Sequence, residues 1–170
     1  MCGIFGIIGK SNNNLADIKS LARHAKRRGA DSSGVMLFQD QYSVERADFD
    51  ILRLTNNLTI NNPEIFLGIG RLITNDNYAN QPFLSDNICV FHNGIVVNDN
   101  EVFEKEKIKR LSNLDTEVFH ALVKKYSKDM DLDKFKDIFL SKCQGTFSVA
   151  IALPKLGKLI LFSNHGSLYL

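Results

Sequence analysis

Apolar and polar positions follow two different periods along this chain. Residues 3–8 form an apolar run between glycines, which predicts a buried strand. Apolar side chains then recur at helical spacing over residues 15–25, with Asn14 as a candidate N-cap. This second pattern predicts a helix that ends near Gly29.

Further short apolar runs, bounded by turn residues, predict strands along the rest of the chain. They cover residues 35–38, 42–47, 66–71, 88–92, 95–97, 146–153 and 158–162. Asn93-Gly94 separates two of these runs, and this dipeptide predicts a tight hairpin turn. Residues 48–64 are rich in Asn and poorly patterned, so we expect a loop there with about one helical turn.

Helical patterns return in the second half of the chain. Residues 99–111 are highly charged and typical of a helix. A second helix with a clearer apolar face is predicted to begin near Asp115, and either Asp115 or Thr116 could be its N-cap. Another helix is expected from Asp131 to Leu140. This order of strands and helices predicts an antiparallel sheet with helices packed on it, in one domain without an internal linker.

Composition and charge narrow the class of protein. A chain of 170 residues with 44% hydrophobic residues can form a domain with a core of its own. Its 21 basic and 19 acidic residues offer no electrostatic argument for binding nucleic acid or a membrane surface. A short basic cluster is expected to be a solvated helix end; it consists of Arg23, Lys26, Arg27 and Arg28.

Targeting and redox features indicate the cytoplasm. No apolar run approaches the roughly 20 residues of a membrane helix, and the N-terminus lacks the pattern of a signal peptide. Cys2, Cys89 and Cys143 are odd in number and widely spaced. They therefore predict neither a disulfide framework nor a metal site.

Cys2 is the first candidate for chemistry, because it directly follows Met1. If Met1 is removed, Cys2 carries a thiol nucleophile and an amine base on one residue. A Cys at the start of an apolar strand is also commonly a small buried hydrophobe. The other residues of the chain must decide between these two interpretations.

Four further segments carry candidate chemistry, and each has a purely structural alternative. Residues 28–34 could simply end a helix at Gly29. Arg71 could hold a carboxylate through its paired donors, or pack its stem on the sheet. Asn93-Gly94 could offer an amide and a backbone N–H to an oxyanion, or only turn the chain. Asp115 could hold an ammonium group or cap a helix.

Together and in this order, these motifs resemble the glutaminase domain of class II glutamine amidotransferases, which are N-terminal nucleophile hydrolases. The domain of glucosamine-fructose-6-phosphate aminotransferases is especially similar. The matching segments are 1–9, 28–34, Arg71 with Thr74, 80–82, 92–95 and 115–118. The resemblance covers nearly the whole chain, and it implies an enzyme.

The resemblance implies a reaction at Cys2. Once Met1 is removed, the thiol attacks the side-chain amide of L-glutamine, ammonia leaves, and water hydrolyses the thioester to glutamate. The α-amine of Cys2, with a reference pKa of about 7.7–8.0, would be the base. The oxyanion would lie between the Asn93 amide and the Gly94 N–H.

Substrate recognition is implied in the same way. Arg71 would bind the α-carboxylate of glutamine and Asp115 its α-ammonium, while Thr74 and Asn75 would add hydrogen bonds. Arg28 would support the N-terminal residue, and Gly29 would permit close backbone approach. Neither a metal nor an organic cofactor is implied.

The implied fold is α+β, a four-layer α/β/β/α sandwich of two mostly antiparallel sheets. We expect a glutaminase domain over residues 1–170, without an acceptor or synthase domain; a domain truncated at its C-terminal end, a natural fragment and a small stand-alone domain all stay open. Ammonia would pass to a sugar-phosphate aminotransferase-like acceptor on a partner or missing domain. Neither nucleic acid nor a membrane is expected as a partner, and self-association is left open.

Two alternatives stay open at this point. Many relatives carry His where Ile69 stands, and this departure motivates a catalytically inactive glutamine-binding or regulatory module on the same fold. The other alternative is an N-terminal nucleophile amidase or peptidase that acts on a different acyl group. Arg71 and Asp115 argue against it, because such a substrate would not need both charges.

Overall fold

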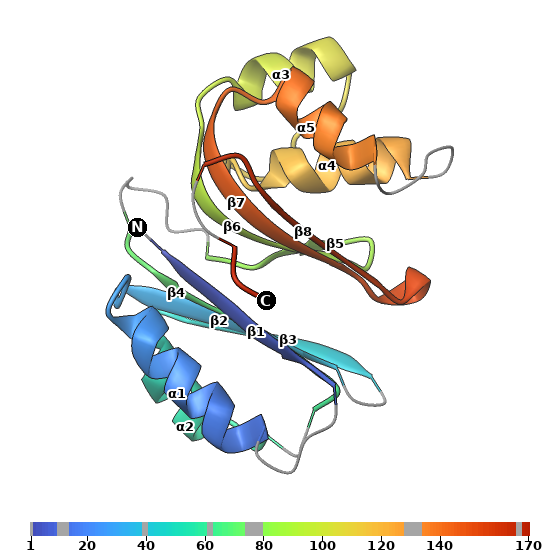
Figure 1. Ribbon diagram of the computed structural model, residues 1–170. Helices are drawn as coiled ribbons and strands as arrows, with labels where there is room; N and C mark the ends of the chain where they lie inside the picture. Colours follow the sequence, from blue (N-terminus) through green and yellow to red (C-terminus); the bar gives the residue numbers. More distant parts are fainter. Residues whose placement is uncertain are drawn as a thin grey trace. The chain divides into compact units, whose positions relative to one another are not determined.

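The computed structural model describes residues 2–9, 14–38, 41–60, 63–73, 80–127, 134–165 and 168–170. The chain divides into two compact units, residues 1–82 and residues 83–170. Each unit contains one four-stranded antiparallel sheet together with helices (Figure 1). The predicted α+β class with two mostly antiparallel sheets is therefore confirmed.

The sheet of unit 1, residues 1–82, has the strand order β1-β4-β2-β3. Its strands are β1 (Gly3–Ile8), β2 (Ser32–Phe38), β3 (Tyr42–Ala47) and β4 (Ile65–Arg71). The prediction of a buried strand over residues 3–8 is right about the strand and wrong about its burial. Because β1 is an edge strand, Gly3 is buried but the side chain of Ile8 is 63% exposed.

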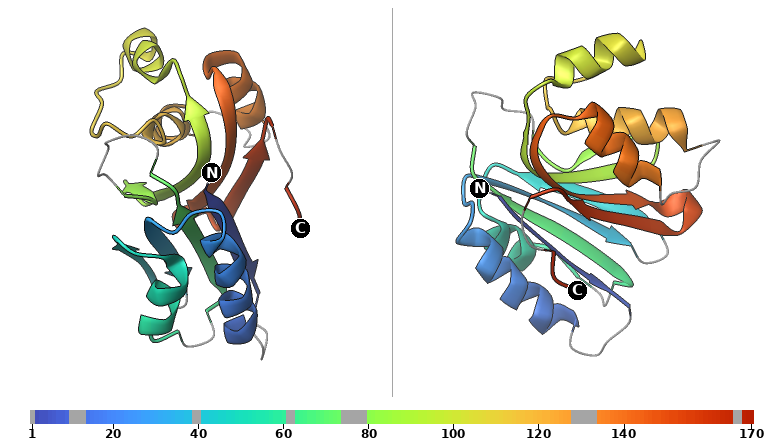
Figure 2. Two further views of the ribbon diagram at one scale, coloured as in Figure 1. Left: turned by 90° about the vertical axis from the view of Figure 1, so that its left-hand side faces the viewer. Right: turned by 45° about the horizontal axis from the view of Figure 1, so that its top comes forward.

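Two helices, α1 (Asn14–Lys26) and α2 (Ile51–Asn57), lie side by side on one face of this sheet (Figures 1 and 2). Their apolar faces bury Ile18 and Ile51 against Phe66 of β4. The loop expected around α2 is thus a seven-residue helix. The Asp50 carboxylate caps it by accepting hydrogen bonds from the backbone N–H groups of its first turn.

The sheet of unit 2, residues 83–170, has the order β5-β6-β7-β8. Its strands are β5 (Phe83–Ser85), β6 (Ile88–Val96), β7 (Gly145–Leu153) and β8 (Lys158–Ser163). The predicted hairpin turn at Asn93-Gly94 is wrong, because β6 runs straight through this dipeptide and pairs with β7. The tight turn lies instead between β5 and β6, at Asp86 and Asn87, whose φ angles of 51° and 61° suit a primed hairpin turn.

Three helices accompany this sheet: α3 (Asp99–Glu106), α4 (Glu117–Tyr126) and α5 (Phe135–Lys142). Helix α3 ends earlier than predicted, because Lys107 adopts a left-handed conformation that closes the last turn. Thr116 is the N-cap residue of α4, but its side chain makes no capping hydrogen bond. The cap expected at Asp131 lies outside the described residues.

The core of unit 2 is aromatic. Phe119 of α4 packs with ring centroids 5.2 Å from Phe139 of α5 and 5.0 Å from Phe147 of β7. All three side chains are fully buried, as is Phe91 of β6. These contacts join α4 to α5 and to β7.

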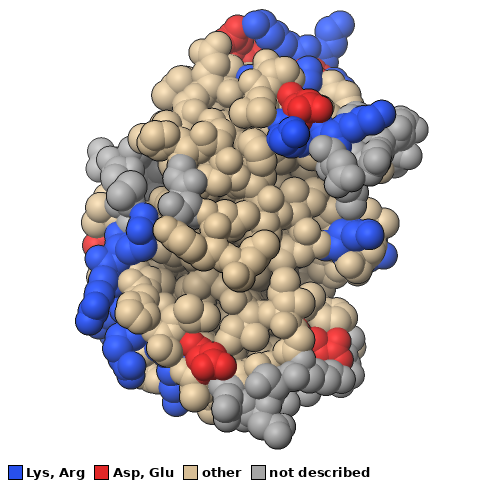
Figure 3. All heavy atoms as spheres, in the orientation of Figure 1, with Lys and Arg blue, Asp and Glu red and all other residues tan. Residues whose placement is uncertain are grey.

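Charged side chains gather on the outer face of α1, where Figure 3 shows a continuous group of Lys and Arg atoms. Arg23, Lys26, Arg27 and Arg28 are all exposed, so the prediction of a solvated helix end is confirmed. Among the helices of the described ranges, none is long and apolar enough to cross a membrane.

Candidate active site

The predicted site residues fall into two groups, one in each unit. Cys2, Arg28, Gly29 and Arg71 belong to unit 1. Asn93, Gly94 and Asp115 belong to unit 2. Thr74 and Asn75 lie outside the described residues. Within unit 1, the structure brings Cys2 against Arg28 and Gly29 against Arg71; within unit 2, it joins Asp115 to the strand that carries Asn93 and Gly94.

Cys2 lies immediately before β1 and is partly exposed. The Arg28 side chain donates a hydrogen bond from Nε to the Cys2 carbonyl oxygen, at 3.1 Å. This bond joins the residue after the end of α1 to the residue before β1. A guanidinium group therefore orients the backbone of the predicted nucleophile.

Gly29 packs directly against the end of β4. A Cβ atom at Gly29 would lie 2.3 Å from the carbonyl carbon of Arg71 and 2.4 Å from the N atom of Leu72. Real Cβ atoms essentially never come this close, so a larger residue would push the two backbones apart. The predicted close approach at Gly29 is present, and the backbone that it approaches is that of the predicted carboxylate-binding residue.

Asp31 secures the same strand end by two hydrogen bonds. Its backbone N–H donates to the Arg71 carbonyl oxygen at 2.9 Å, and its carboxylate accepts from the Ile73 N–H at 2.8 Å. The motif of residues 28–34 is thus more than a helix end. It wraps the backbone on both sides of Arg71 and fixes the direction in which that strand leaves the sheet.

Arg71 is the last residue of β4 and is only 9% exposed. Its Nη1 lies 3.5 Å from the Asn80 side-chain oxygen, which also accepts from Ser32 Oγ at 3.2 Å. The Asn80 amide nitrogen donates to the carbonyl oxygens of Ser33 and Ala47. Asn80 therefore links Arg71 to β2 and β3, a role that only the match of residues 80–82 to a family motif could have suggested.

Asn93 and Gly94 are presented from the middle of a strand rather than from a turn. Gly94 pairs with Phe147 and has φ 141°, and a Cβ there would lie 2.0 Å from the Thr146 carbonyl oxygen. Both its conformation and its close approach to β7 require glycine. Asn93 is partly exposed and Gly94 is exposed, so an amide and a backbone group stand together on an accessible part of β6.

Asp115 connects the loop before α4 to the end of β6. Its Oδ2 accepts from the Val96 N–H at 3.0 Å, and its Oδ1 lies 3.6 Å from Nδ1 of the buried His92. Burial works to raise the pKa of Asp115, but the His92 ring and the backbone N–H groups of Val96 and Thr116 outweigh it. The pKa of Asp115 is held below its usual range, and its side chain is 29% exposed.

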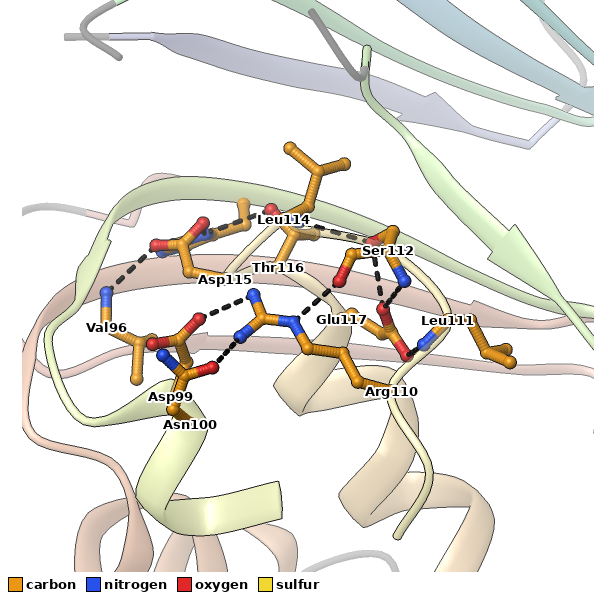
Figure 4. A network of polar contacts seen from close by, with 11 residues as sticks. Val96, Asp99, Asn100, Arg110, Leu111, Ser112, Leu114, Asp115, Thr116 and Glu117 are labelled. Carbon is orange, nitrogen blue, oxygen red and sulfur yellow. Dashed lines mark hydrogen bonds and ion pairs between the residues drawn. The ribbon is translucent and has the colours of Figure 1, made fainter. Parts of the chain in front are cut away.

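Sequence reasoning missed two residues that fix the loop carrying Asp115. Figure 4 shows that Arg110 and Glu117 both bind Ser112, three residues before Asp115. Glu117 is 1% exposed, which is unusual for a carboxylate, and its place in the matched segment 115–118 was the available signal. In the described part of the chain, no cluster of His, Cys, Asp or Glu could hold a metal ion.

Comparisons with known proteins identify the class. A family model described as a glutamine amidotransferase domain matches residues 70–169, which is more than half of the chain. The chain therefore belongs to the glutamine amidotransferase domain family. This confirms the resemblance to the class II glutaminase domain that the motifs indicated.

Particular relatives can then be named. The chain is 26% identical over its whole length to 40% of a 7-cyano-7-deazaguanine synthase from Saccharolobus solfataricus. Over 98% of its length it is 27% identical to 29% of a glutamine–fructose-6-phosphate aminotransferase from Campylobacter jejuni. The chain thus spans less than half the length of these curated relatives.

A solved structure shares the fold. The glutamine phosphoribosylpyrophosphate amidotransferase of B. subtilis matches 90% of this chain with a TM-score of 0.67 and 22% identity, over 35% of its own chain. At this identity the likeness concerns the fold alone. It agrees with the two antiparallel sheets and their helices described above.

Proposed function

We propose that this chain is a glutaminase module that releases ammonia from L-glutamine through a thioester on Cys2. The observation that carries the proposal is the strand end of unit 1, where Arg28 holds the Cys2 carbonyl and Gly29 packs on the backbone of Arg71. In a member of the glutamine amidotransferase family, this arrangement suits a thiol and a guanidinium that serve one substrate.

The reaction begins after Met1 has been removed. The neutral α-amine of Cys2 takes the thiol proton through a water molecule, and the thiolate attacks the amide carbon of glutamine. The Asn93 amide and the Gly94 N–H stabilise the oxyanion; one such donor is typically worth about 3–4 kcal/mol. The ammonium form of the amine then protonates the leaving amide nitrogen, so that the C–N bond breaks and ammonia departs, and water hydrolyses the thioester to glutamate.

Recognition of glutamine depends on its two charged ends. Arg71 binds the α-carboxylate through paired donors, and Asp115 binds the α-ammonium. Thr74 and Asn75 contribute further hydrogen bonds. The lowered pKa of Asp115 supports this role, because a carboxylate that stays ionised can bind a cation over the whole physiological range.

The ammonia needs an acceptor, and we place it on a partner chain or a further domain. The name glutamine–fructose-6-phosphate aminotransferase among the relatives supports an acceptor of the sugar-phosphate aminotransferase type. Residues 1–170 would then act as one glutaminase domain.

The experiment combines mass spectrometry with kinetics. Intact mass should show loss of Met1, and a diazoketone analogue of L-glutamine should label Cys2 and block release of glutamate. Cys2→Ala should abolish both, whereas Lys105→Ala on the exposed face of α3 should change neither. A folded, Met1-free sample that is not labelled would contradict the proposal. Binding of glutamine without turnover would favour the inactive regulatory module.

A further inference from the structure

Asp115 lies near the end of a loop that has no regular secondary structure of its own. This segment, which we call the Asp115 loop, comprises residues 107–116 between α3 and α4. A loop normally allows a side chain to move by more than hydrogen-bond geometry tolerates. Precise placement of the Asp115 carboxylate therefore requires contacts that hold the loop from outside.

Glu117 holds the loop from the first turn of α4. Its carboxylate accepts hydrogen bonds from the backbone N–H groups of Leu111 and Ser112, at 2.7 and 2.6 Å, and from Ser112 Oγ at 2.8 Å. The Ser112 hydroxyl oxygen in turn accepts from the Leu114 N–H at 3.2 Å. One buried side chain thus binds the loop backbone directly and reaches, through Ser112, the residue next to Asp115 (Figure 4).

Arg110 holds the loop from the opposite side. Its guanidinium forms an ion pair with Asp99 at 2.6 Å and a hydrogen bond to the Asn100 side-chain oxygen, both in the first turn of α3. Its Nε donates to the Ser112 carbonyl oxygen at 2.6 Å. The planar fork thereby joins two acceptors on α3 to one acceptor in the loop (Figure 4).

These two anchors and the Asp115 carboxylate belong to one connected network. Arg110 and Glu117 meet at Ser112, and Asp115 completes the loop by binding the Val96 N–H of β6. Movement of Ser112 would therefore shift the backbone that carries Asp115.

We infer that Arg110 and Glu117 are positioning residues that set the selectivity of this site for a substrate with an α-ammonium group. The inference rests on the proposed function, because it assumes that Asp115 binds that group. An ammonium held by a carboxylate is bound equally in the ground state and in the transition state. Displacing the carboxylate should therefore raise KM and leave kcat nearly unchanged.

The test compares L-glutamine with glutaramate, which is glutamine without its α-amino group. Glu117→Gln keeps the size of the side chain but presents an amide NH₂ where an acceptor stood, and Arg110→Lys loses the planar fork. Each variant should lower the ratio of kcat/KM for glutamine to that for glutaramate about tenfold, the effect expected for one misplaced charge-assisted hydrogen bond. The activity toward glutaramate itself should stay within about twofold of wild type, since no interaction with Asp115 is lost.

Controls separate this role from a merely structural one. Lys105→Ala, on the same helix as Asp99 and Asn100, should leave the ratio unchanged. A thermal unfolding curve establishes that each variant is folded, and Asn100→Ala offers a milder change that removes one acceptor of Arg110. If a folded variant loses activity toward both substrates equally, or if the ratio does not move, the inference is wrong.

Failure of the proposed function would look different. In that case wild type itself would not hydrolyse glutamine, and calorimetry would then compare the binding of glutamine and glutaramate to wild type and Glu117→Gln. A tenfold loss of affinity for glutamine alone would still support positioning by Glu117. An equal affinity of wild type and variant for glutamine would overturn it.

Discussion

The two groups of site residues are held in place by different physical means. In unit 1, the end of β4 that carries Arg71 is fixed by close backbone packing at Gly29. In unit 2, Asp115 is fixed by charged side chains, chiefly Arg110 and Glu117. Close backbone packing does not tolerate a larger side chain, but it does not depend on pH. A network of charged side chains can accept a residue of similar shape, but its strength depends on the ionisation of its members.

The largest effect is expected from a substitution that disrupts the packing of unit 1. Gly29→Ala should lower the free energy of unfolding by about 3 kcal/mol, because its Cβ would overlap the backbone of Arg71 and Leu72. Gly9→Ala is the matched control: Gly9 has φ 105° but no neighbour within 4 Å of its Cβ, so only about 1–2 kcal/mol of strain is expected. Urea unfolding measures both. Equal losses would show that crowding at Gly29 is unimportant.

The next prediction concerns the stability of unit 2 and its dependence on the ionisation of one carboxylate. Burial works to raise the pKa of Glu106, but hydrogen bonds from Lys125, Lys142 and Tyr126 outweigh it and lower the pKa to about 2. Since the usual value is 4.5, this carboxylate stabilises the fold above pH 4.5, and the stabilisation is lost as the pH falls toward about 2. The free energy of unfolding of wild type should exceed that of Glu106→Gln by about 1–2 kcal/mol at neutral pH, because solvent screens the partly exposed lysine partners, and the gap should close in acid.

The free energy of unfolding of wild type and of Glu106→Gln is measured by urea unfolding across this pH range. Glu101→Gln is the control, because Glu101 lies on the same helix and pairs with the exposed Lys105. Its effect should stay within about 1 kcal/mol at every pH. A gap between wild type and Glu106→Gln that does not change between neutral and acidic pH would contradict the assignment.

A smaller effect compares the two proposed charge contacts with glutamine. Arg71→Lys keeps the positive charge but loses paired donation, so KM for glutamine should rise about tenfold. Asp115→Asn removes the charge of its contact, and KM should rise about tenfold or more. Steady-state kinetics with glutamine and with glutaramate tell them apart: only Asp115→Asn should lose its effect when the α-amino group is absent. The same loss for Arg71→Lys would show that the two roles are assigned wrongly.

The smallest effect concerns a side chain in unit 1 that lies apart from the site. Asp50→Ala removes the N-cap of α2 and its bonds of 3.1 and 3.0 Å to Leu52 N and Arg53 N. Stability should fall by about 1 kcal/mol without any change in KM. Circular dichroism during urea unfolding checks the first expectation, and glutaminase assays check the second. A change in KM would mean that α2 communicates with the strand ends.

Local patterns predicted the strands of this protein well, because each reflects a short-range alternation of apolar and polar residues. The pairs β2–β3 and β7–β8 lie close to where their patterns put them. The turn at Asn93-Gly94 shows where local reasoning fails. This dipeptide favours a turn in isolation, but pairing of β6 with β7 over eight residues keeps it extended. The actual turn, Asp86-Asn87, follows a strand too short to predict.

The identity of the candidate site was contained in the sequence by itself, because motif residues such as Cys2, Arg71 and Asp115 are recognised by type and order. What holds them in place was decided only by the tertiary structure. Gly29 meets the backbone of Arg71, and Arg110 meets Asp99, through contacts between separate elements. Such contacts depend on where whole strands and helices pack, and no short-range pattern records that.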